Sequence, residues 1–494
     1  MILNADICHR ALDARDARFD GLFLVGITTT HVYCRPVCPT RLARHDHRRF
    51  FESAAAAELA GFRPCLRCRP ELAPGRALID AVPRLAQVAA HMISAGALNG
   101  RGVAALAGEL GVSERHLRRA LEREIGASPL ALAQTYRLLL AKRLLADTPL
   151  PVTRVAFASG FQSLRRFNAL FRARYRLSPS DLRRAPAPPT RAATSPAPDL
   201  VQLTLAYRAP LAWDVLVTVL GRDAWPGVEA VQGARYGRTV RLEGYSGIVL
   251  ATDAAERGHL TVGVSPALLP VLMPLLARLR HVFDLDAEPT VVDAHLAQGG
   301  LDALVRRRPG VRLPGALDGF EGALRVLLPR RRAGLLVAAL GEAVDSGIPE
   351  LTRLMPSATR VAEAGVARLV RLGVSRRPAE VIVAVARALA AGIIRLEPNS
   401  DVAATHRALV RIAGMGDRLA TAIVMRALCW PDAFPVADRA LQRAAGVTTP
   451  RLLATRAEQW RPWRAYAALH LWLADEKGET GNNARRFPRR GRPS

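Results

Sequence analysis

The chain has 494 residues, 50% hydrophobic content and a formal net charge of +27 at pH 7. At roughly 100–200 residues per domain, this length predicts three or four packed domains. So positive a charge favours a polyanionic partner, most simply nucleic acid. We find no signal peptide, no lipidation motif and no apolar run long enough to cross a bilayer, so we expect no membrane partner and a cytoplasmic location.

Four of the six cysteines lie close together near the start of the chain. Cys34 and Cys38 form a C-x3-C pair, and Cys65 and Cys68 form a C-x2-C pair after 26 intervening residues. Short-spaced thiolate pairs separated by a loop are typical of a tetrahedral Zn2+ site. A thiolate site suits a reducing cytoplasm. On spacing alone, a purely structural zinc site is the more frequent interpretation.

The residues around these cysteines form a more specific pattern. They read Thr-Thr-Thr-His-Val-Tyr-Cys-Arg-Pro-Val-Cys-Pro over 28–39 and Gly-Phe-Arg-Pro-Cys-Leu-Arg-Cys over 61–68. This stretch resembles the methylphosphotriester-accepting domain of the Ada family of alkylation-response proteins. The resemblance implies that all four thiolates bind zinc and that Cys34 is also the nucleophile. It also places three residues at DNA-backbone contacts: Thr30, Arg41 and Arg63.

The implied chemistry is a methyl transfer that consumes the protein. Zinc keeps a thiol deprotonated at neutral pH, and the thiolate is the reactive form. Attack on the methyl carbon of a neutral phosphotriester gives a thioether on Cys34 and restores the phosphate anion. The formal charge of the centre then falls from −2 to −1, so its repulsion of DNA phosphates weakens. This change predicts a switch towards tighter DNA binding.

Residues 80–184 show a helical pattern that contains two similar units. In the first, a small-residue helix over 103–107 leads through Gly111 to Ser113, a good helix N-cap, and then to a basic helix. In the second, the stretch 155–161 precedes a basic helix over 164–175, and a helix over 130–145 connects the two units. The candidate DNA-binding arginines are Arg115, Arg118, Arg119, Arg165 and Arg166.

These two units resemble the AraC/XylS-type DNA-binding domain, especially through the Gly-Phe-Gln-Ser-Leu-Arg-Arg-Phe run over 160–167. The resemblance implies that both basic helices enter major-groove segments on one face of DNA. Their arginines can read guanine edges or hold phosphates, and both alternatives stay open. An activator of this kind is expected to act with RNA polymerase. His116 is interpreted as a surface or phosphate contact rather than a metal ligand.

The second half of the chain begins after a Pro- and Ala-rich linker over 185–199. Short β-like runs occur over 200–290, and the pattern is then helical to about residue 473. Gly414 and Gly416 fit a helix-hairpin-helix turn whose backbone approaches a DNA phosphate. The segment 476–494 is predicted to be a basic tail.

Residues 200–475 resemble AlkA-type 3-methyladenine DNA glycosylases, through Arg-Leu-Pro-Gly over 312–315, the hairpin and the stretch 427–438. The resemblance implies that Asp438 stabilises the positive charge on the deoxyribose as the damaged base leaves. It also implies that Trp472 lines the pocket for the flipped base. The alternative for Trp472 is a core tryptophan with a satisfied N–H.

The chain departs from this family at positions that normally build the base pocket and the DNA wedge. The family's Trp-Thr pair and nearby Tyr are replaced by Arg418, Leu419 and Ala422, so two pocket aromatics are missing, and Ala413 replaces the usual proline of the hairpin. The wedge segment reads Pro-Arg-Arg-Arg over 329–332, so Arg331 is a candidate DNA contact. Lost stacking, worth roughly 1–3 kcal/mol per base, predicts weaker excision or an altered substrate.

The prediction is a multidomain α+β protein. Its expected parts are a zinc methyl-acceptor domain of α/β type (1–76), an all-α double helix-turn-helix domain (80–184), the linker (185–199), an antiparallel β subdomain (200–290), an all-α helix-hairpin-helix glycosylase domain (291–475) and the tail (476–494). The predicted function is methyl acceptance from DNA methylphosphotriesters, activation of transcription at promoter sites and excision of alkylated bases from double-stranded DNA. The alternative is a methylation-switched regulator whose glycosylase-like domain only binds DNA.

Overall fold

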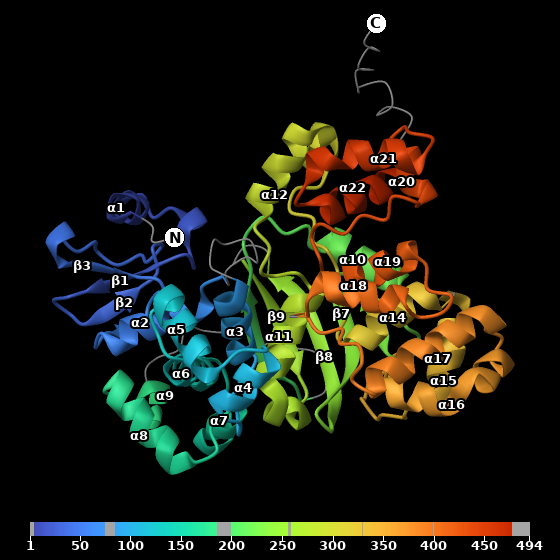
Figure 1. Cartoon of the computed structure of the whole chain (residues 1–494). Coiled ribbons are helices and arrows are strands. Elements are labelled where there is room, and N and C mark those ends of the chain that lie inside the picture. Colours follow the sequence, from blue (N-terminus) through green and yellow to red (C-terminus); the bar gives the residue numbers. More distant parts are fainter. Residues whose placement is uncertain are drawn as a thin grey trace, which may run out of the picture. The chain divides into compact units, whose positions relative to one another are not determined.

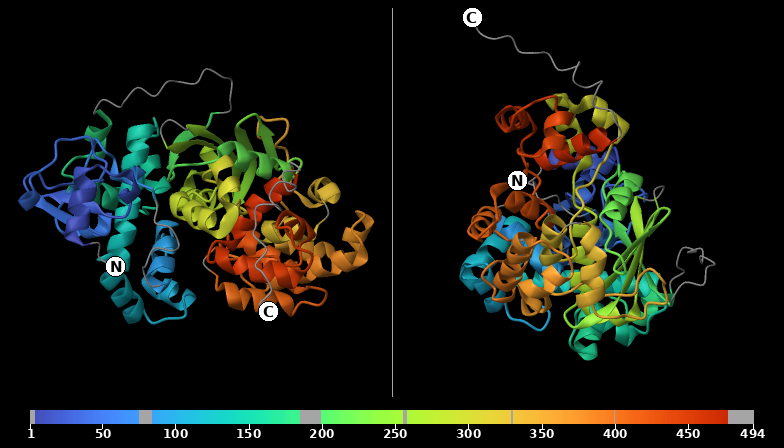
Figure 2. Two further views of the ribbon diagram at one scale, coloured as in Figure 1. Left: turned by 90° about the horizontal axis from the view of Figure 1, so that it is seen from above. Right: turned by 90° about the vertical axis from the view of Figure 1, so that its right-hand side faces the viewer.

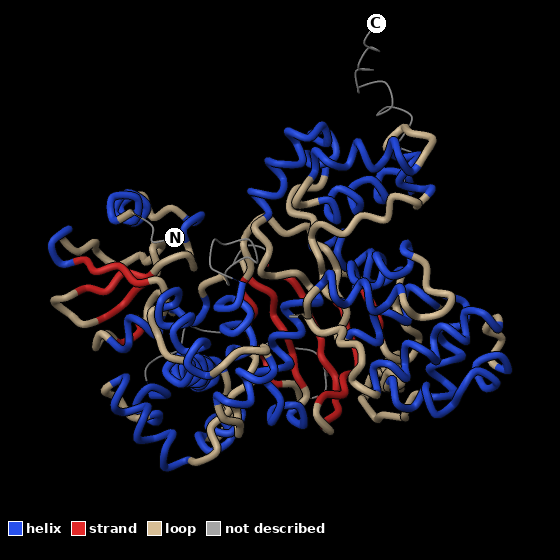
Figure 3. The backbone as a smooth tube through the Cα atoms, viewed as in Figure 1, coloured by secondary structure: helices blue, strands red, loops and turns tan. Residues whose placement is uncertain are grey.

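The computed structural model describes residues 4–74, 84–184, 199–254, 258–328, 330–398 and 400–476. The chain forms two compact units. The first comprises Met1–Tyr207, Leu242–Gly247 and His259–Ala277, and the second comprises Arg208–Arg241, Ile248–Gly258 and Arg278–Ser494. Figure 1 gives the element labels used below, and Figure 3 separates helices from strands by colour.

The first unit begins with an N-terminal module, residues 4–74, built on a small sheet. Its strands take the order β3-β1-β2-β4, with β1 antiparallel to β2 and β3, and β4 parallel to β2. Successive side chains of a strand point to opposite faces, so the short strand β2 places Tyr33 on one face and Cys34 on the other. Tyr33 packs with Phe51 and Phe62 on the face covered by α2, whereas Cys34 packs with Leu12 and Val25. The module's elements are α1 (Ala5–Asp13), β1 (Leu24–Ile27), β2 (Val32–Cys34), β3 (Arg48–Phe51), α2 (Ala54–Leu59), β4 (Arg63–Pro64) and the short helix η3 (Pro70–Leu72).

The double helix-turn-helix domain follows, and the predicted helices are present. The two basic helices begin at serine N-caps, where the Ser113 and Ser163 hydroxyls accept hydrogen bonds from backbone N–H groups of the first turn. Their apolar sides are buried, and all of their arginines except the half-buried Arg174 are exposed, as the 3.6-residue period leads us to expect. The helices are α3 (Arg84–Ser94), α4 (Val103–Glu109), α5 (Glu114–Ile125), α6 (Pro129–Asp147), α7 (Val152–Ala158), α8 (Leu164–Tyr175) and α9 (Pro179–Arg184).

The stretch 200–290, where the sequence predicted only short strands, contains helices as well as a sheet. Its sheet has the strand order β5-β9-β8-β7-β6, and β5 pairs antiparallel with β9, as β6 does with β7. Two helices in this stretch, α10 (Trp213–Arg222) and α11 (Leu272–Val282), were missed because continuous apolar runs fit a buried helix and a buried strand equally well. The strands are β5 (Val201–Ala206), β6 (Glu229–Gln232), β7 (Arg235–Leu242), β8 (Tyr245–Ala254) and β9 (His259–Val264).

The helical part of the second unit packs around two apolar cores. One core joins α14 to α19 and is centred on residues such as Leu324, Ile382 and Ile423. The other joins α12 and α13 to α20, α21 and α22, which lie together in Figure 1. The helices are α12 (Pro289–Leu296), α13 (Asp302–Arg307), α14 (Gly319–Leu327), α15 (Arg330–Leu340), α16 (Ala358–Arg371), α17 (Arg376–Ala390), α18 (Val402–Val410), α19 (Asp417–Ala427), α20 (Arg439–Ala444), α21 (Pro450–Ala457) and α22 (Arg464–Glu476).

A buried ionic cluster ties strands β6 and β7 to helix α14 inside the second unit. The Arg238 guanidinium donates to Glu321 at 2.8 Å, and Arg325 bridges Glu321 and Glu229 at 2.6 and 2.5 Å. All four side chains are at most 7% exposed, so each charge depends on its partners rather than on water.

The predicted linker and basic tail lie almost entirely outside the described residues, as does Pro329. Among the helices that are described, none combines the length and the apolar character needed to cross a bilayer.

Candidate functional site

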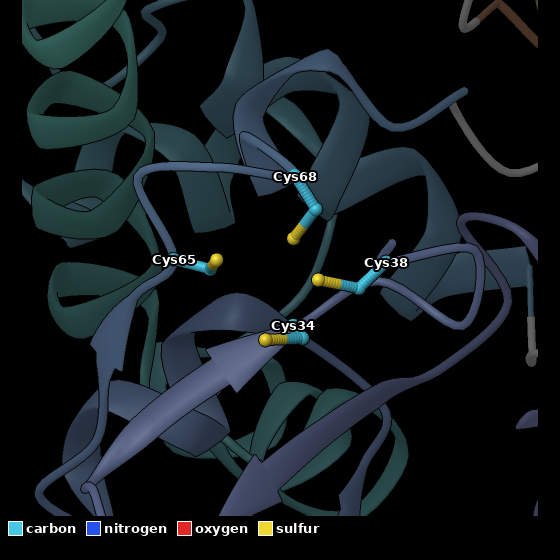
Figure 4. Close-up of side chains that lie close together, drawn as sticks. All are labelled: Cys34, Cys38, Cys65 and Cys68. Atoms are coloured by element: carbon cyan, nitrogen blue, oxygen red, sulfur yellow. The ribbon is translucent and has the colours of Figure 1, made fainter. Parts of the chain in front are cut away.

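The four predicted cysteine ligands come together in the N-terminal module. Their sulfur atoms all lie within 4.8 Å of one another, and all four side chains are buried. Figure 4 shows the sulfurs of Cys34, Cys38, Cys65 and Cys68 converging on a common centre from the end of β2, the loop after it and the segment after β4. A tetrahedral zinc with Zn–S distances of about 2.3 Å needs sulfurs about 3.8 Å apart. The donor set and its spacing therefore fit zinc.

The cysteine cluster needs a cation to hold several negative charges together. Hydrogen bonds with Cys65 and Cys68, together with burial, raise the pKa of the Cys34 thiol, because a thiolate there would face other sulfurs in a dry environment. A divalent cation reverses this balance and favours the thiolates. The exposed fraction does not single out a nucleophile, since Cys34 and Cys65 are both 7% exposed.

Two residues near the cysteines were missed at the level of sequence. The backbone N–H of Arg35 donates to Cys68 Sγ at 3.4 Å, and its guanidinium donates to the Cys68 carbonyl at 3.3 Å. The same guanidinium pairs with the buried carboxylate of Asp20, with one Nε–Oδ1 distance of 2.9 Å. Arg35 thus fastens the Cys68 loop to the segment that follows Cys34. No local pattern could reveal this pair, because its partners are 15 residues apart.

The predicted DNA contacts of the N-terminal module lie in three different places. Thr30 is exposed in the turn between β1 and β2, and Arg41 is exposed in the loop before β3. Arg63 is half-buried in β4, opposite Val32 of β2. All three residues lie on the module that holds the cysteines. In the described structure, no interaction joins them into one cluster.

The basic helices of the double helix-turn-helix domain present most of their arginines to solvent. Leu117 and Leu121 of α5 are fully buried, as are Phe167 and Phe171 of α8. The predicted DNA contacts on the opposite sides of these helices are all exposed: Arg115, Arg118, Arg119, Arg165 and Arg166. His116 is exposed as well, and among the described residues the only group with the geometry of a metal site is the four cysteines.

The predicted hairpin between α18 and α19 is present. Gly414 has a φ of +83°, and a Cβ at this position would lie 2.9 Å from a Val381 methyl group, so both conformation and space favour glycine. Gly416 is the N-cap of α19, and both glycines are exposed. Exposed backbone N–H groups at such a turn suit an anionic ligand. Arg331 of α15 is exposed too, in a different part of the unit.

Asp438 and Trp472 are 34 residues apart in sequence but in direct contact. The Trp472 indole Nε1–H donates to Asp438 Oδ1 at 3.3 Å. The same oxygen accepts the Leu441 backbone N–H at 3.0 Å, because Asp438 is the N-cap of α20. Both side chains are only partly buried. The tryptophan N–H is therefore satisfied by the candidate catalytic carboxylate itself.

Trp472 packs against two apolar clusters of the second unit, one aliphatic and one that contains aromatic side chains such as Phe434 and Trp463. Its ring packs beside Val219, Val311, Leu469 and Leu473. The three positions where the AlkA resemblance leads us to expect other residues, Arg418, Leu419 and Ala422, lie on α19 after the hairpin, and Arg418 is exposed. The aliphatic packing was not predicted, because its members come from three separate segments: α10, the loop at Val311 and α22.

Comparison with known proteins finds matches to three successive parts of the chain. Family models match residues 7–71 (metal binding domain of Ada), 106–185 (helix-turn-helix domain) and 202–318 (AlkA N-terminal domain). The chain is 38% identical over 482 residues to the probable bifunctional transcriptional activator/DNA repair enzyme AlkA of Mycobacterium tuberculosis, covering 95% of this chain and 96% of that protein.

Two Escherichia coli proteins match separate parts of the chain. DNA-3-methyladenine glycosylase 2 is 30% identical over 280 residues, which cover 55% of this chain and 97% of the glycosylase. The bifunctional transcriptional activator/DNA repair enzyme Ada is 33% identical over 125 residues, which cover 25% of this chain and 34% of Ada. The four-cysteine site is a zinc site, and the chain belongs to the family of bifunctional AlkA-type transcriptional activators and DNA repair enzymes.

Proposed function

We propose that this chain is an alkylation-damage response protein with two separate chemistries. It accepts a methyl group from DNA methylphosphotriesters onto Cys34, activates transcription from promoter sites, and excises alkylated bases of the 3-methyladenine type with Asp438. The observation that carries the proposal is the buried four-cysteine cluster in the same chain as the Asp438–Trp472 pair. The relative from Mycobacterium tuberculosis is named a probable bifunctional transcriptional activator/DNA repair enzyme, which supports a joint role in regulation and repair.

For methyl transfer, bound zinc supplies the charge that keeps the cysteine sulfurs deprotonated. The Cys34 sulfur attacks the methyl carbon in line with the methyl–oxygen bond of the phosphotriester. The new S–C bond forms as the C–O bond breaks, and the electron pair stays on the phosphate oxygen. The product is a thioether, so one protein accepts one methyl group. Arg35 keeps the Cys68 loop in place during this change through its bonds to Cys68 and Asp20.

For base excision, the proposed role of Asp438 is electrostatic. A base alkylated on a ring nitrogen is cationic, so it leaves readily with the electron pair of the N-glycosidic bond. Positive charge then develops on the deoxyribose, and a nearby carboxylate stabilises it. Water adds to the sugar carbon and loses a proton. The Trp472 N–H holds the Asp438 carboxylate in one orientation, which reduces the reorganisation needed as charge develops.

We further propose that the domain limits given above define these activities: 1–76 for methyl acceptance, 80–184 for promoter recognition, and 200–290 with 291–475 for excision. The partners proposed are alkylated and promoter DNA, and RNA polymerase for activation in the cytoplasm. The exposed arginines on α5 and α8 support the DNA assignment. Thr30, Arg41, Arg63, Arg331 and the hairpin glycines are proposed contacts to the DNA backbone.

One substrate tests both chemistries. Duplex DNA treated with a methyl-labelled alkylating agent carries label on phosphates and on bases. The intact protein is expected to acquire label covalently and to release labelled 3-methyladenine. Cys34→Ala should lose the first signal alone, whereas Asp438→Asn should lose about 10²–10³-fold in the second alone. Undiminished protein labelling in Cys34→Ala would falsify the acceptor assignment.

The second candidate is a regulator whose glycosylase-like domain binds DNA without cutting the glycosidic bond. The residues Arg418, Leu419 and Ala422 on α19 favour it, because they supply little base stacking. In the same experiment it predicts full protein labelling and no released base from either the intact protein or Asp438→Asn.

A further inference from the structure

The N-terminal module and the double helix-turn-helix domain share a buried polar contact within the first unit. Helix α2 and η3 pack on α6, and β4 packs on α8. Figures 1 and 2 show the N-terminal module beside these helices. We call this contact the docking face and define it by two groups of residues. The first is Arg69, Glu71, Lys142 and Asp147; the second is Ser53, Glu58, Thr135 and Ile125.

The first group is a chain of ion pairs that reaches the zinc loop. Arg69, directly after Cys68, donates two hydrogen bonds to Asp147 at 2.7 and 2.8 Å. Glu71 accepts from Lys142 Nζ at 2.5 Å, and both side chains are at most 3% exposed. Lys142 also donates to the Cys65 carbonyl at 3.3 Å. Helix α6 thus bonds to the backbone of the zinc ligand Cys65 and to Arg69, the residue that follows the ligand Cys68.

The second group fixes the opposite side of the contact. The buried Glu58 carboxylate accepts from the Thr135 hydroxyl at 2.8 Å and from the Tyr33 hydroxyl at 3.2 Å. The Ser53 hydroxyl donates to the Ile125 carbonyl at the end of α5, at 2.8 Å. Ala55 lies inside the apolar core of the first helix-turn-helix unit. Separation of the modules would leave several buried polar groups without partners, which costs far more than breaking exposed ion pairs.

We propose that the N-terminal module and the two helix-turn-helix units engage duplex DNA as one rigid body, with the docking face as the joint. This inference rests on the proposed function. The DNA segment touched by the N-terminal module must then lie at a fixed spacing from the segments read by α5 and α8. Methylation of Cys34 strengthens the contact between the N-terminal module and DNA. Because the joint is rigid, this gain in binding free energy adds directly to the DNA affinity of the two basic helices, α5 and α8.

A rigid joint differs measurably from a flexible tether. Joined contacts bind as a single unit only when the geometry lets them engage together. Insertion of half a helical turn, about 5 base pairs, moves one DNA segment to the opposite side of the duplex. A rigid protein then loses one set of contacts, whereas a loosely tethered one adjusts.

The test uses full-length, zinc-loaded protein methylated at Cys34, and a duplex selected from a random-sequence pool on that protein. Footprinting divides the duplex into the segment covered by the N-terminal module and the rest, and a second duplex carries a 5-base-pair insertion between them. Intact protein is expected to lose about tenfold or more in affinity for the second duplex. Asp147→Arg, which faces Arg69 with a like charge, should bind the first duplex more weakly and lose less than about threefold on insertion.

Two variants serve as controls. Glu109→Ala removes an exposed ion pair with Arg101 in the same domain, and Asp147→Glu keeps the charge, so both should behave as intact protein. Equal tolerance of the insertion by intact protein and Asp147→Arg overturns the rigid joint.

Hydrogen exchange on the unmethylated full chain separates this inference from the proposed function. Asp147→Arg should speed exchange in α6 and in residues 63–72 together, and unchanged exchange there contradicts the docking face. Absence of methyl uptake by the intact protein contradicts the proposed function alone, because the exchange measurement does not depend on Cys34 chemistry.

Discussion

The zinc centre and the Asp438–Trp472 pair are built in opposite ways. The zinc centre draws all its ligands from residues 34–68, and its four buried sulfurs leave little freedom for substitution. Asp438 and Trp472 come from two helices and meet through one 3.3 Å hydrogen bond, and Trp472 packs against side chains from several distant segments. A site whose ligands all lie on one short segment tolerates sequence changes in the surrounding structure. A site whose residues are positioned by distant segments can change substrate or lose activity when those segments change.

Removal of zinc is expected to have the largest effect and to separate the two sites most sharply. Structural zinc contributes roughly 10–16 kcal/mol to small domains at neutral pH, and the N-terminal module has only small apolar clusters besides the metal. Chelation should therefore unfold this module and abolish methyl uptake while leaving base release unchanged. Circular dichroism and both labelling assays on the same sample measure this. Loss of both activities together would contradict the independence of the two sites.

The same contrast explains what could be predicted from the sequence. The zinc ligands were predicted because short spacings lie within one loop and need no knowledge of packing. The serine caps and the basic faces of α5 and α8 follow from local rules of the same kind. Asp438 and Trp472 were found only through a family resemblance.

Contacts between distant segments escaped sequence reasoning altogether. Lys142 and Glu71 are 71 residues apart, and Arg238 and Glu321 are 83 apart. Neither pair was predicted from the sequence. The pairs are buried only because the tertiary fold brings them together, and no local period encodes that.

Glu321→Gln tests how far the Asp438–Trp472 pair depends on the scaffold of the second unit. Burial alone would raise the pKa of Glu321, but Arg238 and Arg325 lower it to about 2, so the charged form is the stable one. Removing one partner of a buried ionic cluster costs about 3–5 kcal/mol. We expect a matching loss in the free energy of unfolding and weaker base release, with methyl uptake unchanged. Glu342→Gln, which removes an exposed pair with Arg241, is the control and should change stability little.

Trp472→Phe sharpens the comparison within the second site. The ring remains apolar and aromatic, but the hydrogen bond to Asp438 is lost. A hydrogen bond to a charged group contributes about 1.5–3 kcal/mol, so base release should fall roughly 10–100-fold. If Trp472 is only a core residue, thermal stability will fall while base release per folded molecule stays constant. Measuring both quantities on one preparation decides between these roles.

The smallest expected effect concerns pH at the docking face. Burial raises the pKa of Glu58 to about 7, although hydrogen bonds from Thr135 and Tyr33 and the charges of Arg174 and Lys142 oppose the rise. A carboxyl whose pKa is higher in the folded state than its ordinary 4.5 stabilises the fold most below pH 4.5, and that stabilisation is lost as the pH rises towards and through 7. Intact protein should therefore lose stability of the first unit, relative to Glu58→Gln, by on the order of 1 kcal/mol between pH 5 and 8.

Glu58→Gln keeps the shape of the side chain and removes the titration. Chemical unfolding followed at several pH values, on intact protein and on this variant, gives the difference directly. Parallel pH profiles would mean that Glu58 ionises at its ordinary pKa, with water reaching the docking face. Such access would weaken the argument for a rigid joint, because a hydrated carboxyl is no longer a buried polar group that must keep its partners. A difference confined to the first unit would leave the Asp438 site untouched, so even this small effect separates the region that binds zinc from the region that depends on its scaffold.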